Sequence, residues 1–160
     1  MKKYGFTGET KLFYDRAILH RIKRLSDGLL GGWIEKESNL SHQGACFVYD
    51  DAKVYDFAEV RDNAEVCGDA EVYGRASVCD NAKVRDNSVI HGSAKIHGNA
   101  TIMENAEVRD DAEIFENAEI KGNMQIIGDV KIRGAVKIYG NAQIRGDCRA
   151  EISLVKTSVR

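Results

Sequence analysis

A six-residue repeat constrains this chain more than any other feature. Eighteen consecutive units run from residue 45 to residue 152, and each reads x-Ala-x-Val/Ile-x-Asp/Gly, as in the unit that begins at Asn63. The branched position holds Val or Ile in seventeen of the eighteen units, with Ala150 as the exception, and the small position holds Ala in twelve. A fixed short period is typical of a solenoid, and it predicts the fold more strongly than the secondary-structure propensity of single residues does.

The order of residues within a unit predicts a very short strand followed by a turn. In the unit that begins at Asn63, Ala64 and Val66 would point inward and the residue after each of them outward. Gly68 and the next residue then supply a turn, because Gly adopts positive φ freely and Asp tolerates it better than most residues do. Such a strand is too short to form a core alone, so it has to stack on later copies of itself.

Three units that close into one coil give a period of 18 residues. Coils would then stack at about 4.8 Å, the usual spacing of neighbouring strands. The branched residues would form three inner columns: Val54, Val72, Ile90, Val108, Ile126 and Ile144; Val60, Val78, Ile96, Ile114 and Ile132; Val48, Val66, Val84, Ile102, Ile120 and Ile138. The eighteen units therefore predict an all-β fold, a parallel β-helix of about six triangular coils.

The first 44 residues lack the repeat and predict a small N-terminal β cap. Such a cap would cover the open edge of the first coil, which would otherwise template aggregation. We expect Trp33, the single Trp, to plug the open end of the prism. The expected strands of the cap are residues 4–10, 11–14 and 18–25, with turns at residues 8–9 and 15–16. The chain thus divides into a cap at residues 1–44, a β-helix at residues 45–152 and a C-terminal strand or tail at residues 153–160.

The pattern Val-x-Asp-Asn-Ala-x resembles the hexapeptide repeat of the left-handed parallel β-helix superfamily, which includes acyltransferases and γ-class carbonic anhydrases. This resemblance implies that the coils are left-handed. Residues 30–35 (Leu-Gly-Gly-Trp-Ile-Glu), followed by Asn39, Leu40, Ser41 and Gly44, resemble the lead-in of the YdcK-like hexapeptide proteins. Similar lead-ins accompany such repeats in phage- and prophage-borne proteins. The resemblance implies a fold more than an activity, because function lies in sites grafted onto folds.

Composition and charge exclude several classes of protein. The net charge of −2 argues against binding of nucleic acid by bulk positive charge, although the basic residues after position 130 leave that possible for the C-terminal coils. No apolar stretch approaches the roughly 20 residues that span a membrane, and no apolar run of a signal peptide follows Met1. The four cysteines form no Cys-x-x-Cys motif. We therefore expect reduced thiols in a cytoplasmic protein.

His91 and His97 are the residues that an enzyme of this superfamily could use. They occupy equivalent outward positions in successive units, and hence adjacent faces. The resemblance implies a catalytic His near a loop that interrupts the coils, with acetyl-CoA or another acyl donor bound between subunits. No loop interrupts this repeat. We therefore expect no catalytic residue and no cofactor, and keep His91 and His97 as candidate general bases under the acyltransferase alternative.

A metal site is not expected. The γ-class carbonic anhydrases bind zinc between subunits through three His side chains, whereas His91 and His97 supply two, and the third would have to cross an interface. His20 and His42 lie in the cap region, away from this pair.

The outward positions predict a binding surface. Aromatic residues on a rigid sheet are good interface anchors, although tyrosine on an exposed strand also reflects β propensity. The expected surface comprises Tyr55, Tyr73, Val89, His91 and Ile127 on one face and Phe115, Lys131 and Arg133 on a second face.

We therefore expect a non-enzymatic β-helix protein that presents a rigid outer surface to a macromolecular partner, most simply a protein. The phage-associated lead-in points to a host protein, such as a component of a defence system. Homo-oligomerisation is expected as well. The alternatives are an acyltransferase-like enzyme and a structural protein that self-assembles end to end through its coil edges.

Overall fold

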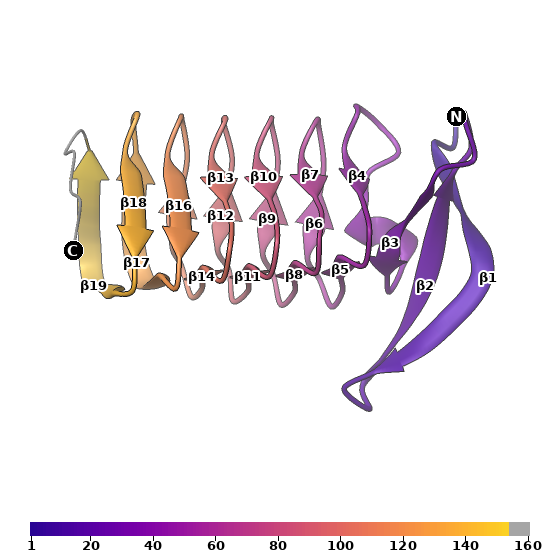
Figure 1. Ribbon diagram of the computed structural model, residues 1–160, viewed down its shortest axis with the longest axis horizontal. Helices are drawn as coiled ribbons and strands as arrows, with labels where there is room; N and C mark the ends of the chain where they lie inside the picture. The colour runs from indigo at the N-terminus through magenta and orange to yellow at the C-terminus, as the bar shows by residue number, and fades with distance from the viewer. Residues whose placement is uncertain (154–160) are drawn as a thin grey trace.

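Parallel strands stack along the length of the protein to form a β-solenoid (Figure 1). The computed structural model describes the backbone of residues 1–153 and the side chains of residues 1–146. Three strands of two residues make up each regular coil, and each strand pairs in parallel with the strand three places later in the chain. The predicted all-β fold of about six stacked coils is therefore confirmed.

The strands build three faces. The first face holds β3 (Leu30–Ile34), β5 (Lys53–Val54), β8 (Glu71–Val72), β11 (Val89–Ile90), β14 (Glu107–Val108) and the first part of β17 (Gln125–Arg133). The second face holds β6 (Glu59–Val60), β9 (Ser77–Val78), β12 (Lys95–Ile96), β15 (Glu113–Ile114) and the remainder of β17. The third face holds β4 (Phe47–Val48), β7 (Glu65–Val66), β10 (Lys83–Val84), β13 (Thr101–Ile102), β16 (Glu119–Gly122) and β18 (Lys137–Gly140). The last strand, β19 (Gln143–Ser153), runs beside β17.

The three predicted columns of branched residues form the interior. On the first face, for example, Val54 pairs with Val72 and Val72 pairs with Ile90, each 18 positions later. The branched positions from Val48 to Ile138 are at most 2% exposed. Burial of these side chains in one continuous core is the main source of stability, since each fully buried Val or Ile contributes about 1.5–3 kcal/mol.

The chain turns from one face to the next at a corner, and a residue in the left-handed backbone conformation lies at each corner. Every sixth residue from position 44 to position 140 has a positive φ, and eight of these residues are Asp or Glu with φ between 54° and 62°. At several corners the Asp carboxylate accepts a hydrogen bond from the N–H of the corner residue one coil later. The Gly68 N–H bonds Asp50 Oδ2 at 3.0 Å, and the Gly98 N–H bonds Asp80 Oδ2 at 2.9 Å. The acidic turn residues are thus explained as structural parts of the corners.

The coils change shape after residue 122. Met124, Val130 and Val136 occupy small positions that hold Ala in the preceding coil, and all three are buried. The corner φ rises to between 84° and 125° at Gly122, Gly128, Gly134 and Gly140. The strands also lengthen, and β17 reaches nine residues. Larger inward side chains therefore accompany glycine corners with larger φ and longer strands.

The last coil corrects the predicted repeat. Gly128 pairs with Gly146, 18 positions later, but Val130 pairs with Ala150 and Ile132 with Ile152, 20 positions later. Two extra residues therefore lie in β19, and the backbone register places Ile152, rather than Ala150, beside Ile132. This accounts for the one unit in which the branched position seemed to hold Ala. The expected tail beyond Ser153 lies outside the described residues.

The N-terminal residues form an antiparallel hairpin that joins the first face. Strand β1 (Tyr4–Phe13) pairs with β2 (Ala17–Arg24), which pairs with β3, and β3 pairs in parallel with β5. The turn predicted at residues 8–9 is wrong: Gly8, with φ 92°, lies in an irregularity within β1. After β3 comes the 3-10 helix η1 (Glu37–Asn39), and Leu40 then bridges to Val60. The first face is therefore extended by β3, and the second face by the bridge at Leu40, before the regular repeat begins.

Trp33 does not plug the end of the prism. Its side chain is 5% exposed but lies outside the coils, packed beneath the hairpin with Ala17, Leu19 and Tyr55. The residues that join the coil interior at this end include Tyr4, Ile22 and Phe47. The Tyr4 hydroxyl donates to the carbonyl oxygens of Glu37 (3.1 Å) and Leu40 (2.9 Å), so its buried polar atom is satisfied.

Three cysteines have described side chains. Cys46 is buried, and Cys67 and Cys79 are partly exposed free thiols that follow strands of the third and second faces. Residues 1–153 contain no helix that is both long and apolar enough to cross a lipid bilayer.

We predict that Ile96→Ala lowers the free energy of unfolding by about 2–5 kcal/mol, because a cavity would replace a fully buried side chain. Glu65→Ala, at the outward position of the two-residue strand β7, should change the free energy of unfolding by no more than about 0.5 kcal/mol. Chemical denaturation of both variants measures the difference. Equal losses would contradict the inward and outward facing described above.

The corner at Gly128 gives a second prediction. A Cβ atom there would lie 2.1 Å from the Gly146 carbonyl oxygen, and φ is +89°. At Gly8 φ is +92°, but no atom lies within 4 Å of the corresponding Cβ position. Gly8→Ala should therefore show only the backbone strain, roughly 1–3 kcal/mol, whereas Gly128→Ala should lose clearly more stability. Similar melting temperatures for the two variants would be the contrary result.

Candidate functional site

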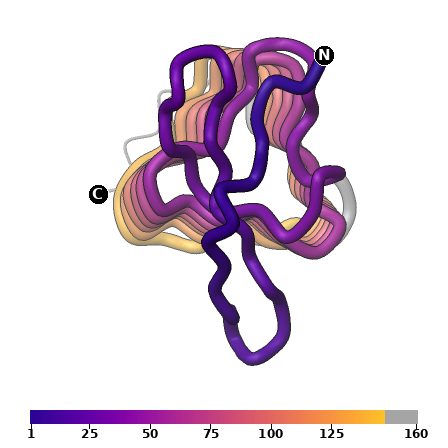
Figure 2. The backbone as a smooth tube through the Cα atoms, turned by 90° about the vertical axis from the view of Figure 1, so that its right-hand side faces the viewer, coloured from indigo at the N-terminus to yellow at the C-terminus, as the bar shows by residue number. Residues whose placement is uncertain are grey.

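The hairpin β1–β2 breaks the regularity of the surface. Viewed down the long axis, the coils superimpose, while the hairpin extends well beyond their outline (Figure 2). A cleft of about 570 Å³ lies between the hairpin tip and the first face. Its lining residues are Phe13, Tyr14, Arg16, Ala17, Tyr55, Glu71, Tyr73, Val89 and Glu107.

Specific contacts hold the hairpin tip against the first coil. The Arg16 guanidinium donates to both carboxylate oxygens of Asp56, each at 2.6 Å. Asp56 is itself a corner residue with φ 56°. The Phe13 ring meets the Tyr55 ring edge-on, with centroids 5.5 Å apart. The tip is therefore tied to the coils by a charged pair and by aromatic packing.

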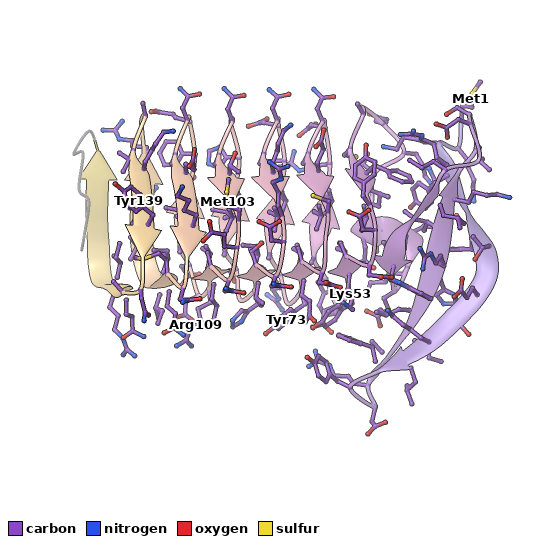
Figure 3. All side chains as sticks on the ribbon, viewed as in Figure 1. Met1, Lys53, Tyr73, Met103, Arg109 and Tyr139 are labelled. Atoms are coloured by element: carbon purple, nitrogen blue, oxygen red, sulfur yellow. The ribbon has the colours of Figure 1, made fainter. Side chains whose placement is uncertain are left out.

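An aromatic ladder runs along the first face below the tip. The rings of Tyr55 and Tyr73 stack at 5.0 Å, and those of Tyr73 and His91 at 4.8 Å, both with interplanar angles of 5°. The three residues occupy the same outward position in successive coils, which explains the parallel rings. Figure 3 shows Lys53, Tyr73 and Arg109 along this side of the prism, the side onto which the hairpin projects.

Two members of the predicted binding surface are buried within the chain. Tyr55 is 4% exposed because the hairpin covers it, and Ile127 is 7% exposed. Tyr73, Val89 and His91 remain partly exposed on the first face. The structure thus brings Tyr73 and Val89 into the cleft and leaves Tyr55 as part of its wall.

Predicted surface residues of the second face form a separate group. Phe115 stacks on His97 with centroids 4.9 Å apart, and the Lys131 ammonium lies 2.8 Å from Glu113 Oε2. The hydrogen bond from Lys131, and then the one from His97, holds the pKa of Glu113 below its usual value. Arg133 is exposed at the end of β17. This group lies on a different face from the cleft.

His91 and His97 do not come together. They follow β11 and β12, which pair with different neighbours. His91 Nε2 lies 2.9 Å from Glu107 Oε1, and His97 Nε2 lies 2.9 Å from Glu113 Oε1. Each His thus has its own carboxylate partner, so the two rings do not share one site.

Asp62, Cys79 and Asp80 place potential metal-ligand atoms within 4.8 Å of one another. Corner geometry accounts for this proximity, because Asp62 Oδ2 accepts a hydrogen bond from the Asp80 N–H at 3.3 Å. Burial raises the pKa of Cys79, which favours the thiol over the thiolate that binds metals. The proximity of these three residues is therefore explained by the geometry of a solenoid corner.

The cleft combines aromatic rings with carboxylates. Glu71 and Glu107 line it from β8 and β14, with Val89 between them in the register. Burial, together with the carboxylates of Glu107 and Glu71, raises the pKa of the Tyr73 hydroxyl. The two carboxylates thus place negative charge near Tyr73, and nearby negative charge disfavours the phenolate.

The sequence analysis did not predict that residues of the hairpin line a cleft. Phe13, Tyr14 and Arg16 come from a segment interpreted only as a cap, and their approach to the first face has no periodic signal. The one available signal was the pair of aromatic residues directly before Asp15, where a turn would normally hold polar residues or glycine.

Neither a protein-family model nor a curated protein sequence matches this chain.

Since Tyr55 is packed on both sides, Tyr55→Ala should destabilise the protein by about 3 kcal/mol or more. Tyr55→Phe keeps the ring and loses only a long hydrogen bond to Glu71, so it should cost no more than about 1 kcal/mol. Urea denaturation measures both. A Tyr55→Ala variant as stable as Tyr55→Phe would show that the ring is not packed beneath the hairpin.

Proposed function

We propose that this protein is a non-enzymatic binding protein that engages a macromolecular partner, most simply a protein, through the cleft between the hairpin tip and the first face. The observation that carries this proposal is the cleft of about 570 Å³, in which aromatic side chains of the hairpin face the strip formed by Tyr73 and Val89. Concave sites with aromatic walls and a few polar groups are the usual places for binding.

The conformation of the hairpin tip supports this proposal. Tyr14 has φ 49° and Asp15 has φ 50°, both in the left-handed region. A residue other than glycine is held there at a cost of roughly 1–2 kcal/mol, and Asn or Gly would be favoured in such a turn. Tyr14 is nevertheless 73% exposed. A strained position that presents an exposed aromatic ring beside a cleft is consistent with selection for contact with a partner.

The regular repeat supports a finer assignment. Six-residue units that stack as parallel strands, three to a coil, are consistent with the hexapeptide-repeat superfamily, whose coils are left-handed. The lead-in that resembles phage-borne proteins makes a host protein, such as a component of a defence system, the first partner to examine. Self-association through the same surface is a further use that fits this proposal.

An acyltransferase is the alternative that one observation favours. The His91 Nε2 atom lies 2.9 Å from Glu107 Oε1, and Glu107 lines the cleft. A His oriented by a carboxylate beside a cleft has the arrangement of a general base. Under this alternative acetyl-CoA or another acyl donor would bind and raise the melting temperature, because a ligand that binds only the native state stabilises it.

The proposal predicts that Tyr73→Ala and Tyr14→Asn each weaken binding of a partner recovered from the natural host and identified by mass spectrometry. A buried aromatic anchor contributes about 2 kcal/mol or more, which is roughly 30-fold in Kd. Tyr14→Asn should leave thermal stability unchanged or raised, because Asn tolerates the left-handed conformation. Isothermal titration calorimetry and thermal melts measure the two effects.

Phe57→Ala is the matched control, since Phe57 is an exposed aromatic residue, 70% accessible, outside the cleft. It should leave the Kd unchanged. Acetyl-CoA should cause no thermal shift. Unchanged binding in both cleft variants would refute the proposed surface, and a thermal shift with acetyl-CoA that His91→Ala removes would favour the acyltransferase.

A further inference from the structure

We infer that the cleft receives a basic side chain, an arginine or a lysine, from the partner protein. This inference rests on the proposed function and specifies its chemistry. The cleft offers the two kinds of group that bind such a side chain, carboxylates and aromatic rings, within one concave site.

The carboxylates come from the first face. Glu71 and Glu107 lie two coils apart, about 10 Å at the usual strand spacing, with Val89 between them. Glu71 has weak internal partners: Lys53 Nζ lies 4.0 Å from Oε1, and the Tyr55 hydroxyl donates to Oε2 at 3.4 Å. Glu107 is more fully engaged, by His91 at 2.9 Å and by Gln125 at 3.2 Å. Glu71 is therefore the carboxylate with capacity for a further, charge-assisted hydrogen bond.

The aromatic rings come from both sides of the cleft. Phe13 and Tyr14 belong to the hairpin, and their rings lie 4.2 Å apart. Tyr73 belongs to the first face. Guanidinium and ammonium groups are attracted to aromatic faces, while the aliphatic stem of Arg or Lys packs on apolar surface such as Val89. A long basic side chain thus matches both the acidic and the apolar parts of the lining.

Among the residues that line the cleft, the basic side chain is that of Arg16, and it is already paired. Arg16 is held by both oxygens of Asp56 at 2.6 Å, which neutralises its charge locally. Lys53 lies 5.5 Å from the Phe13 ring centroid and 4.0 Å from Glu71. Arg109, which is not a lining residue, has its Nε atom 3.6 Å from Glu107 Oε1, too far for a hydrogen bond. Lys53 shows that a cation is already accommodated between Phe13 and Glu71, at the edge of the cleft.

Other occupants fit less well. A phosphate or nucleic acid would meet the carboxylates of Glu71 and Glu107, and like charges repel. A wholly apolar segment would remove these carboxylates from water without replacing their hydrogen bonds, which is costly. A positively charged group with an apolar stem is the occupant that this lining favours.

The test uses the whole chain and two peptides, acetyl-Gly-Arg-Gly-amide and the same peptide with citrulline, which has nearly the same shape but no charge. We expect the arginine peptide to cause saturable chemical-shift changes at the Tyr73 and Val89 amides. The citrulline peptide should bind at least about tenfold more weakly, because charge-assisted hydrogen bonds are the stronger ones. Added salt should weaken the arginine complex, as screening requires.

Two variants locate the interaction. Glu71→Gln keeps the size of the side chain and should weaken binding of the arginine peptide about tenfold. Glu65→Gln changes the equivalent outward position of the third face, outside the cleft, and should leave binding unchanged. Thermal melts of both variants confirm that they remain folded.

Equal binding of the two peptides, no saturation, or shifts that avoid Tyr73 and Val89 would overturn the inference. The proposed function fails separately. If the arginine peptide does not bind but Tyr73→Ala still weakens the partner complex, the cleft is a docking site for other chemistry. If the arginine peptide binds at the cleft but neither cleft variant affects the partner, the basic side chain is recognised and the proposed docking surface is wrong.

Discussion

The left-handed backbone conformation at every sixth residue is the constraint on which the structure depends. A two-residue strand can join a parallel neighbour only if the chain turns at each corner of the coil. Positive φ from position 44 to position 140 provides that turn. Where the corner residue is Asp, its carboxylate in several coils accepts a hydrogen bond from the N–H of the corner residue one coil later. Asp86 accepts such a bond from the Glu104 N–H at 2.9 Å. The side chain thus helps to offset the backbone strain and ties successive coils together. Where the corner residue is Gly, the close approach of the next coil leaves little room for a Cβ, as at Gly122, where it would lie 2.3 Å from the Gly140 carbonyl oxygen.

Identical coils place residues 18 positions apart directly above one another, so any side chain type that recurs becomes a ladder. The stacked rings of Tyr55, Tyr73 and His91 follow from this geometry and do not by themselves indicate a function. The second face shows the same effect with His97 and Phe115. A regular surface of this kind lacks concave features. The N-terminal hairpin changes this, because its tip lies over the first coils and converts a flat strip into a cleft.

The sequence predicted the periodic part of the fold and little of the cleft. The six-residue period accounts for the inner columns, the corners and the burial of Met124, Val130 and Val136. In a solenoid the period determines the register, that is, which residues stack in successive coils. The buried position of Tyr55 could not be predicted, since it depends on contacts with Phe13 and Ala17, about 40 residues earlier and outside the repeat. Trp33 was misplaced for the same reason. The two extra residues in β19 leave no signal in the six-residue pattern, because a unit with Ala150 at its branched position still fits a constant 18-residue register.

Departures from local preference gather at the hairpin tip and the adjoining face. Tyr14 has a backbone conformation that favours Asn or Gly, yet it presents an exposed ring. Glu71 lies beside aromatic groups with only distant partners of its own, although fully paired acids are common elsewhere on the solenoid, as with Glu113 and Lys131 at 2.8 Å. Natural sequences usually satisfy local rules and depart from them where function requires it. Two unrelated departures, one of backbone strain and one of incomplete pairing, therefore coincide with the one cleft described above. This coincidence is the physical reason for placing recognition there, whereas the aromatic ladders and the acidic corners are explained by the fold alone.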